Sequence, residues 1–432
     1  MNPALRLKQI ILVIGDIAIL YGALALALII RYRAPLTSGA FINHLQPFSI
    51  LFALWIIIFY INGLYEIHKL KNTPAFIKNL GAAVTVGTLI AIIFFYLITD
   101  YGIAPKTNLF IFLVVSFVCI YIWRSFYNNF VGRHLPMTAV TLLGANPFTA
   151  ELTQTIRHNP QLGYRMVNAI ESADLIVVPA HFKHDPRVTR TLYHYATAGV
   201  EVMDTIAFYE LLMQKLPVHE LEDTWFLRHL VNRHTIYDFF RLPTEIFCAA
   251  FLLVVSLPLT AVIAVLVKLT SRGPIIFKQV RVGEFGKQFT LYKFRSMIAN
   301  APDGSAEAVS GPQWKTADDP RFTALGRIIE RTHLDELPQL VNIVKGEVSF
   351  VGPRPERPAF VTQLKEKMPF YELRHLVKPG IAGWAQLHYS YGSSVNDAYE
   401  KLQYDLYYLK NRSFWLDLGI IIKTIKLFFT KP

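Results

Sequence analysis

The chain has 432 residues, of which 53% are hydrophobic and 17% are charged, and its formal net charge is +12. Soluble domains usually carry about a quarter charged residues, so this composition indicates a membrane protein and excludes a disordered chain, a collagen-like fibre and a small disulfide-bonded scaffold. The excess of basic residues indicates anionic partners such as lipid headgroups, phosphates or nucleic acid.

Four apolar segments in the first third have the length of membrane-spanning helices, which need about 20 residues. They cover residues 10–30, 48–65, 79–99 and 107–123. Basic residues flank both ends of this group and the loop between its second and third segments, so both ends are expected in the cytoplasm. Asp16 lies inside the first segment and is expected to face another helix, because an isolated carboxylate is costly in a bilayer. We predict a four-helix transmembrane bundle over residues 1–135.

Residues 136–230 have the pattern of a small parallel α/β domain. Strands are predicted at 138–144, 173–180 and 200–204, and helices at 147–159 and 187–199. The turn after the first strand, Gly144-Ala145-Asn146-Pro147, is not a GxGxxG phosphate-binding loop, and its proline removes an amide that a phosphate would use. We predict a degenerate Rossmann-like domain that acts as a structural or regulatory spacer, and dinucleotide binding is the disfavoured alternative.

The remaining residues, 231–432, begin with a fifth apolar run at 246–267. Ser256 and Pro258 lie at its centre, where proline removes a helical hydrogen bond and bends the axis. Basic residues flank both ends of the run, which places both ends in the cytoplasm. We therefore predict a re-entrant helical hairpin over 245–268 that enters one leaflet and returns. A kinked transmembrane helix is the alternative.

A strongly basic segment follows at 268–297, with seven Lys or Arg against one acid, Glu284. Aromatic and β-branched residues alternate with the basic ones, which predicts a β-hairpin that turns near Glu284. One interpretation is contact with anionic lipid. The other is a diphosphate-binding clamp with bidentate arginines and point-charge lysines. The members of that clamp would be Arg281, Arg295, Lys278 and Lys293.

Leucines and valines at helical spacing from Leu334 to Val344 predict an amphipathic helix that carries Asp335 and Glu336 side by side. Alone, such a pair is typical of a solvated surface. Beside a basic hairpin, one carboxylate is suited to hold Mg²⁺ together with substrate phosphates, and the other is suited to attack phosphorus. The rigid turn GPRP that follows presents Arg354, with an ordinary loop as the alternative.

Two further motifs and an apolar tail end the chain. The segment 375–386 contains Lys378 in a tight basic loop that suits a phosphate or nucleoside. A helix at 399–411 carries Asp405 among aromatic residues typical of a membrane interface. The tail at 414–429 is predicted to form an amphipathic helix in the membrane plane.

Six motifs occur in order within residues 240–430: FKQVRVG, KFRSM, LDELPQL, SFVGPRP, KPGIAGWAQ and YDLYYLKN. Together they resemble the bacterial sugar transferase family, the polyprenyl-phosphate phosphoglycosyl transferases of monotopic type. The helical front end and the spacer look like the large members, which begin exopolysaccharide, capsule or O-antigen synthesis. The resemblance implies a membrane α/β protein whose C-terminal α+β catalytic domain is held at the cytoplasmic face of the bacterial inner membrane by the re-entrant helix.

The resemblance also implies an activity. A sugar-1-phosphate would move from a nucleoside diphosphate sugar, here predicted to be a UDP sugar, to undecaprenyl phosphate. Asp335 would attack the phosphate next to the sugar and form a covalent phosphosugar intermediate, and Glu336 would hold the required Mg²⁺. The predicted substrate-binding residues are Lys278, Arg281, Lys293, Arg295, Arg331, Arg354, Lys378, Gln386 and Asp405. Membrane lipid is a further expected partner, nucleic acid is not, and a homo-oligomer is compatible with the sequence.

Three positions depart from the pattern of the family. Glu330 stands where a cation is usual, with Arg331 next to it, and Ala382 replaces a threonine. The helix break reads Ser256-Leu257-Pro258 rather than Ser-Pro. These changes bear on the phosphate contact and the hairpin geometry, and none removes the Asp-Glu pair.

Two other classes of function are open. A non-enzymatic membrane scaffold would use the bundle and the spacer to gather a polysaccharide assembly complex. A transporter or flippase is disfavoured, because the first four segments lack the charges and helix breaks typical of transport sites.

Overall fold

The computed structural model describes residues 3–32, 38–66, 70–98, 105–131, 137–144, 147–179, 182, 185–222, 225–226, 229, 236–299, 321–389 and 394–427. The chain divides into two compact units, Met1–Phe208 and Tyr209–Pro432. Within the described residues, five helices are long and apolar enough to cross a membrane, four in the first unit and one in the second. By this measure of length and composition the chain is a multi-pass membrane protein.

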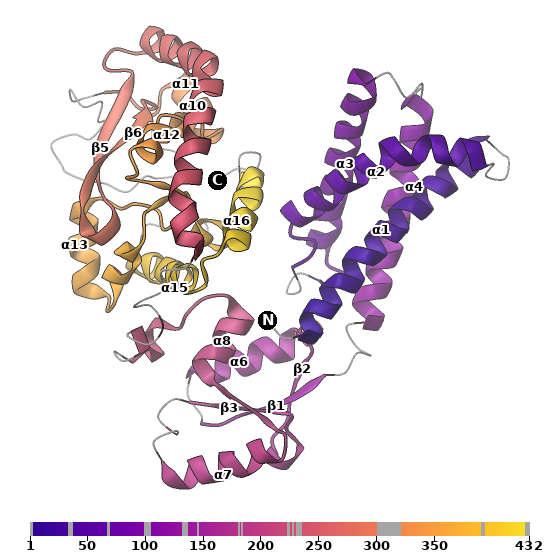
Figure 1. The fold of residues 1–432 in the computed structure, drawn as a ribbon, viewed down its shortest axis with the longest axis vertical. Coiled ribbons are helices and arrows are strands. Elements are labelled where there is room, and N and C mark those ends of the chain that lie inside the picture. Colours follow the sequence, from indigo (N-terminus) through magenta and orange to yellow (C-terminus); the bar gives the residue numbers. More distant parts are fainter. Residues whose placement is uncertain are drawn as a thin grey trace. The chain divides into compact units, whose positions relative to one another are not determined.

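The first unit begins with four long apolar helices (Figure 1). They are α1 (Pro3–Tyr32), α2 (Ser38–Ile61), α3 (Pro74–Leu97) and α4 (Pro105–Phe126), and a π-helical turn, Tyr127–Val131, extends α4. Helix α4 packs against α1 and α3, and α3 packs against α2. Aromatic rings fill the space between them, with Phe48 against Phe112 at 5.3 Å and Trp55 against Phe112 at 5.5 Å between ring centroids. The four segments predicted to span a membrane are therefore helical.

One charged pair lies in this apolar interior. Asp16 and Arg124 have no exposed surface. Arg124 Nε donates to Asp16 Oδ1 at 3.0 Å, Arg124 Nη2 donates to Asp16 Oδ2, and Arg124 Nη1 donates to the carbonyl of Leu64 at 2.5 Å. The guanidinium also lies 5.0 Å from the centre of the Tyr65 ring. The prediction that Asp16 faces another helix is confirmed, and its partner comes from the end of α4.

A four-stranded parallel sheet follows in the same unit. Its strands are β1 (Thr138–Leu142), β2 (Tyr164–Met166), β3 (Leu175–Val178) and β4 (Glu201–Asp204), in the order β2-β1-β3-β4. Helices α6 (Pro147–His158) and α7 (Pro186–Thr197) connect the strands, with 3-10 turns at Pro160–Leu162 and Ile170–Ser172. Helix α8 (Thr205–Met213) follows β4, and its residues from Tyr209 onward belong to the second unit. The predicted parallel sheet is confirmed. Strand β2 was not predicted, because three residues are too short to show an alternating pattern, and Ala145 and Asn146 of the predicted turn lie outside the described residues.

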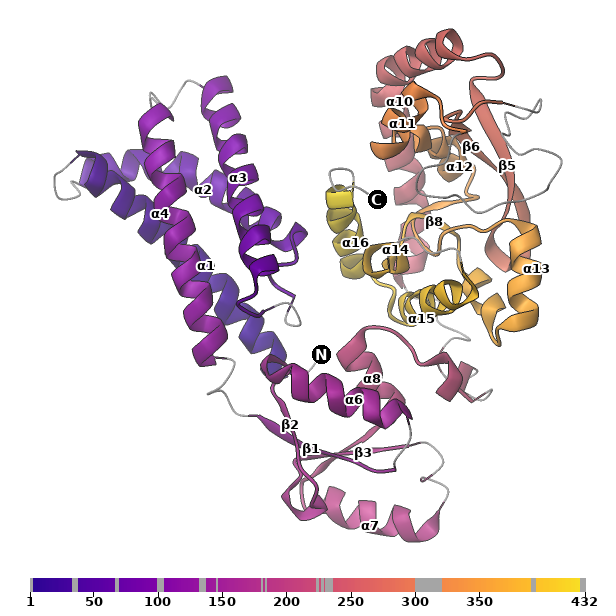
Figure 2. The same cartoon turned by 180° about the vertical axis from the view of Figure 1, so that it is seen from behind.

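The second unit is built on one long helix, α10 (Ile236–Thr270, 35 residues), with Pro243 and Pro258 inside it. Figures 1 and 2 show that its last part runs in a different direction from its first part. Only Ala249, Ile263 and Val267 of this helix are buried, and most of its large apolar side chains are exposed. A helix with so few buried residues packs against the rest of its unit along one narrow stripe. Its remaining apolar surface is suited to contact with lipid.

The predicted basic β-hairpin is confirmed. Strands β5 (Ile276–Val282) and β6 (Gln288–Phe294) pair antiparallel, and Phe285 and Gly286 turn the chain with φ of +53° and +75°. Phe277 pairs with Lys293 and Arg281 pairs with Phe289, whereas Lys278 pairs with Tyr292. Because successive side chains alternate between faces, Arg281 and Lys293 share one face of the hairpin and Lys278 lies on the other.

Short elements pack on this hairpin and on α10. They are α11 (Ala324–Arg331), a 3-10 turn (Leu334–Glu336), α12 (Gln339–Val344), β7 (Ser349–Val351), α13 (Pro358–Lys367), a 3-10 helix (Tyr371–Leu376), β8 (Gly380–Ala382), α14 (Trp384–His388), α15 (Val395–Asn411) and α16 (Phe414–Leu427). One core joins Ala249 of α10 to Leu291 and Ile343, and another joins Val351 to Trp384, Tyr408 and Ile420. These two clusters hold the hairpin and β7 to the helices around them.

Residues 209–222 belong to the second compact unit, ahead of the predicted boundary at 231. Glu210 accepts hydrogen bonds from Lys410 at 2.5 Å and from Asn411 at 2.6 Å. The carbonyl of Gln214 accepts from Trp384 Nε1 at 2.9 Å, and a 3-10 turn, Val218–Glu220, follows. These hydrogen bonds hold residues 209–222 against α14 and α15.

Candidate functional site

The predicted helix from Leu334 to Val344 is wrong as a continuous element. Helix α11 ends at Arg331, His333 adopts a left-handed conformation with φ of +51°, and Asp335 and Glu336 lie in a 3-10 turn. Pro338, which has no amide hydrogen to donate, precedes α12. A left-handed residue other than glycine is strained, so the packing around it must hold it in place. The break turns the Asp-Glu pair out of helical register and toward β6.

Four charged side chains form the dyad cluster, which we define as Lys293, Asp335, Glu336 and Arg354. Lys293 Nζ lies 2.6 Å from Glu336 Oε1 and 3.5 Å from Asp335 Oδ2. Arg354 Nη2 donates to the same Glu336 oxygen at 3.0 Å. The side chains of Asp335 and Glu336 are buried, with 4% and 9% of each residue exposed. Within the described residues, Asp335 Oδ1 is buried without a hydrogen-bond partner.

The cluster gives its two carboxylates opposite protonation behaviour. Burial raises the pKa of Asp335 to about 6, although Lys293 acts against this shift. Burial would also raise the pKa of Glu336, but Lys293 and Arg354 outweigh it and hold that pKa well below its usual range. Burial alone would lower the pKa of Lys293, and the neighbouring carboxylates raise it instead. Glu336 is therefore a fixed anion paired to cations, and Asp335 is a more basic carboxylate with one buried oxygen that has no hydrogen-bond partner among the described residues.

Arg354 is held in place by a backbone frame. The carbonyls of four consecutive residues, 353–356, each accept a hydrogen bond from a residue elsewhere in the unit, and two of the donors lie in β5. The donors are Gly380 N at 3.0 Å, Arg374 Nη2 at 3.0 Å, Arg281 Nη1 at 2.9 Å and Val282 N at 2.9 Å. Gly352 precedes the frame, and a Cβ there would collide with the carbonyl of Lys378. The GPRP turn thus has little freedom, which fixes the place from which Arg354 reaches Glu336.

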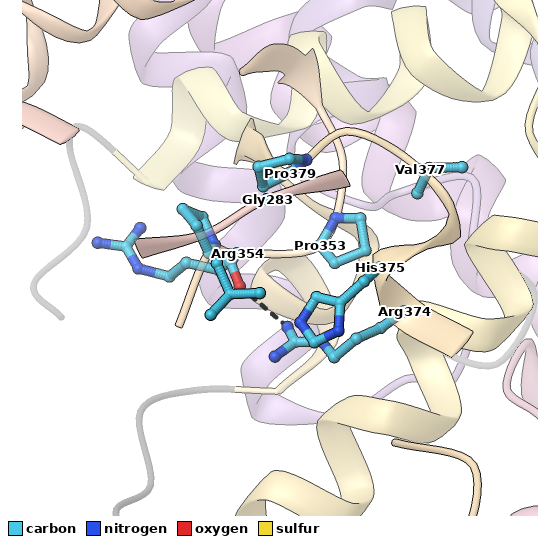
Figure 3. A pocket seen from close by; sticks show the side chains of 9 residues that line it. Gly283, Pro353, Arg354, Arg374, His375, Val377 and Pro379 are labelled. Carbon is cyan, nitrogen blue, oxygen red and sulfur yellow. Dashed lines mark hydrogen bonds between the residues drawn. The ribbon is translucent and has the colours of Figure 1, made fainter. Parts of the chain in front are cut away.

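Asp405 supports this frame indirectly, through Arg374. It pairs with Arg374, whose Nε and Nη2 lie 3.1 and 2.8 Å from Asp405 Oδ2. Arg374 also donates to the Tyr371 hydroxyl at 2.7 Å and to the Arg354 carbonyl, the bond drawn in Figure 3. Burial raises the pKa of Asp405 to about 6, against the effect of Arg374. Asp405 therefore positions the Arg354 loop through Arg374, and its own contacts are not with the dyad.

The structure separates the other predicted site residues from the dyad cluster. Arg281 lies on the same hairpin face as Lys293 but binds the frame carbonyl of Pro355 and the Glu356 carboxylate at 3.7 Å. Lys278 is exposed on the opposite face, and Arg331 is exposed at the end of α11. Arg295 is 2% exposed and donates to carbonyls of residues 267, 271 and 272, so it caps the end of α10.

Three predicted residues have local contacts of their own. Lys378 Nζ lies near Gly346, just beyond the end of α12. Gln386 Nε2 donates to the carbonyl of Ile381 at 3.2 Å. Ser256 Oγ donates to the carbonyl of Leu253 at 3.1 Å, one turn back along α10 and two residues before Pro258.

Sequence reasoning missed Arg374 and His333. Arg374 directly precedes the motif at 375–386, but no spacing in the sequence marks it as a buried residue. His333 directly precedes the LDEL motif, and a histidine carries no strong signal for a left-handed conformation.

The model of the bacterial sugar transferase family matches residues 236–431, which contain the dyad cluster and its frame. A UDP-N-acetylgalactosamine-undecaprenyl-phosphate N-acetylgalactosaminephosphotransferase of Aeromonas hydrophila is 42% identical over 195 residues, covering 45% of each chain. An exopolysaccharide production protein of Rhizobium leguminosarum bv. phaseoli is 39% identical over 186 residues, covering 42% of this chain and 90% of the relative. The chain belongs to the bacterial sugar transferase family.

A UDP-glucose:undecaprenyl-phosphate glucose-1-phosphate transferase of Escherichia coli (strain K12) is 40% identical over 185 residues, which cover 42% of this chain and 38% of the relative. The match thus spans less than half of this relative and of the Aeromonas one. The names of these relatives differ in the sugar they give.

The dyad suits Mg²⁺ by its donor chemistry. No group of three or more His, Cys, Asp or Glu side chains able to hold a metal occurs in the described part of the chain. Mg²⁺, however, is commonly bound by one or two carboxylates and completed by water and substrate phosphates. Two adjacent buried carboxylates, of which Glu336 is held ionised, fit that kind of site.

Proposed function

We propose that this protein transfers a sugar-1-phosphate from a nucleoside diphosphate sugar to undecaprenyl phosphate, through a covalent intermediate on Asp335. The observation that carries the proposal is the dyad cluster, in which a buried carboxylate with a free oxygen adjoins a paired carboxylate and two cations. Membership of the bacterial sugar transferase family supports it. Two of the relatives are named after UDP sugars, which favours UDP as the nucleoside diphosphate.

In the first step, Asp335 Oδ1 attacks the phosphorus next to the sugar. An aspartyl oxygen–phosphorus bond forms, and the bond from that phosphorus to the bridging oxygen breaks, so the nucleoside monophosphate leaves with the electron pair. Lys293 and Arg354 offset the negative charge that gathers on the phosphate oxygens. The raised pKa of Asp335, about 6, makes its carboxylate a better nucleophile while leaving it mostly ionised at neutral pH.

In the second step, a phosphate oxygen of undecaprenyl phosphate attacks the same phosphorus. The aspartyl oxygen–phosphorus bond breaks, Asp335 regains its carboxylate, and the lipid carries a diphosphate-linked sugar. Splitting one displacement in two avoids bringing two polyanions together in one transition state. When bound at Glu336, Mg²⁺ supplies positive charge to the substrate phosphates.

The membrane helix brings this chemistry to the lipid substrate. We propose that α10 is re-entrant, with its bend near Pro258 inside the cytoplasmic leaflet of the inner membrane. Two features support this: the change of direction in Figures 1 and 2, and basic residues before and after the helix. Both ends of α10 would then return to the face on which nucleotide sugars are made.

The test is to trap the intermediate. Full-length protein is incubated with UDP-N-acetylgalactosamine or UDP-glucose alone, digested, and analysed by mass spectrometry for sugar-phosphate on the peptide around residue 335. Asp335→Asn should carry no adduct and should lose exchange of labelled UMP into the UDP sugar. Glu366→Gln, an exposed acid-to-amide change on α13, is the matched control and should retain both. Exchange that persists in Asp335→Asn contradicts the proposal.

A further inference from the structure

A second cluster of charged side chains lies where α10 meets β7 and α16. We call it the helix-base cluster and define it as Tyr237, Arg241, Glu245, Ser349 and Asp417. The first three come from α10, the fourth from β7 and the last from α16. Its charged side chains are largely buried, and the Tyr237 hydroxyl donates to Asp417 Oδ2. Buried charges are costly unless they stay paired, so this cluster favours one arrangement of the three elements.

Arg241 joins the three elements through one guanidinium. Its Nε pairs with Glu245 Oε1 at 3.0 Å, one turn further along α10. Its Nη2 donates to Ser349 Oγ and to the carbonyl of Val351, and lies 3.4 Å from Asp417 Oδ2. Ser349 Oγ donates in turn to Glu245 Oε1 at 2.6 Å. A planar guanidinium reaches several acceptors at fixed angles, so β7 is held to α10 in a defined position.

Strand β7 leads directly from this anchor to Arg354. Val351 is the last residue of β7, and two residues separate it from Arg354. The first of them, Gly352, donates its amide to the carbonyl of Ala382 at 2.8 Å, and a Cβ there would collide with neighbouring backbone. The connection therefore has little slack, and a shift of Val351 would carry the start of the GPRP turn with it.

The two helices of the cluster also carry exposed apolar side chains. On α10, Phe247, Phe251 and Val254 are more than half exposed, and on α16 so is Trp415. Both helices are labelled in Figures 1 and 2. Side chains of this kind are expected to contact lipid. Arg241 thus connects helices with lipid-facing surface to the loop that enters the dyad cluster.

We propose that Arg241 is a positioning residue for sugar-phosphate transfer, and that it acts through Arg354. By holding β7 to α10, it fixes the place from which Arg354 reaches Glu336 and the donor phosphate. The inference rests on the proposed function, because it concerns the same reaction. A displacement of about 1 Å in a positioned group can cost about 100-fold in rate. Loss of Arg241 therefore lowers the rate by misplacing Arg354.

A double-mutant cycle tests this route. Exchange of labelled UMP into the UDP sugar is measured with the detergent-purified full chain, at an enzyme concentration high enough for the slowest variants. Arg241→Met should lower the exchange rate by about 10- to 100-fold. In an Arg354→Met background the same change should cost less than about threefold, because the arginine that it would misplace is already absent. In a Lys293→Arg background, which alters the other cation of the dyad cluster, the full loss should remain.

Thermal unfolding of each variant gives the folded fraction by which its rate is corrected. Arg190→Met, an exposed arginine on α7, is the matched control and should exchange UMP as wild type does. If Arg241→Met does not fold, Ser349→Ala takes its place in the cycle. It removes one acceptor of Arg241 on β7 and should lower exchange about fivefold, with no further loss in the Arg354→Met background.

Equal losses in the wild-type and Arg354→Met backgrounds overturn the inference, because a cluster that only stabilises the unit would act alike in both. Exchange at the wild-type rate in folded Arg241→Met also overturns it. Neither result touches the proposed function while wild type exchanges UMP and carries sugar-phosphate at residue 335. Absence of both from wild type defeats the proposed function instead.

Discussion

The helical bundle and the second unit each contain a cluster of buried charged side chains, and the two clusters differ in whether each carboxylate oxygen has a hydrogen-bond partner. In the bundle, both oxygens of Asp16 accept hydrogen bonds from Arg124, and a third nitrogen of that arginine binds the Leu64 carbonyl. In the dyad cluster, two cations converge on one oxygen of Glu336, while the buried Asp335 Oδ1 has no partner among the described residues. We call the Asp16–Arg124 pair closed, because both carboxylate oxygens have partners. We call the dyad cluster open, because one buried oxygen of Asp335 has none among the described residues.

This difference indicates what each cluster is for. A buried pair whose donors and acceptors are matched holds helices together but has nothing left to offer a ligand. Under the proposed function, the unpartnered oxygen of Asp335 and the neighbouring cations would meet a substrate that brings its own negative charge. Asp405 and Arg374 are an intermediate case. They pair with each other, and Arg374 also donates hydrogen bonds to the Tyr371 hydroxyl and the Arg354 carbonyl.

Removing the ammonium of the open cluster should give the largest effect. Lys293→Met should lower kcat for sugar-phosphate transfer by about 100- to 1,000-fold, the usual loss for one preorganised donor in a transition state. Lys293 also lowers the pKa of Asp335, so its removal should raise that pKa above about 6. Because Asp335 must be ionised to attack, the acid limb of the pH–rate profile should move to higher pH. Steady-state rates between pH 5 and 8 measure both effects.

Lys287→Met provides the control for that profile, since Lys287 is exposed at the end of the same hairpin turn. Its rate and its acid limb should match wild type. An acid limb in Lys293→Met that is unchanged or moves to lower pH would contradict the electrostatic role given to Lys293, even if the rate falls.

Breaking the closed pair should change stability and leave the chemistry intact. Asp16→Ala leaves Arg124 buried without its counter-ion, which should destabilise the bundle by about 3–5 kcal/mol. The double variant Asp16→Ala, Arg124→Met removes both charges and should recover most of this loss. Thermal unfolding of the detergent-purified proteins measures it. A lower transfer rate per folded Asp16→Ala molecule would show that the bundle pair contributes to activity, and would remove the contrast drawn above.

Local patterns predicted much of the fold, and long-range contacts decided the rest. The apolar helices, the parallel sheet and the basic hairpin follow from strong periodicity and composition. The dyad itself was found by motif, but its 3-10 turn depends on the strained His333, which tertiary packing must hold. Arg295 was predicted to bind substrate because its charge is visible in sequence, whereas its use as a cap for α10 depends on where the chain returns.

The register in which β5 pairs with β6 is another feature that the sequence pattern does not reveal, and it gives the prediction with the smallest expected effect. From sequence, Lys278 and Lys293 are equivalent members of a clamp, but the register of β5 and β6 puts them on opposite faces. Lys278→Met should therefore change kcat and KM for the nucleotide sugar by less than about twofold, as exposed substitutions away from a site usually do. The measurement is a donor titration beside Lys293→Met under identical conditions. A tenfold rise in KM for Lys278→Met would place the donor on the far face of the hairpin, away from the open oxygen of Asp335, and the clamp would have to be rebuilt around that face.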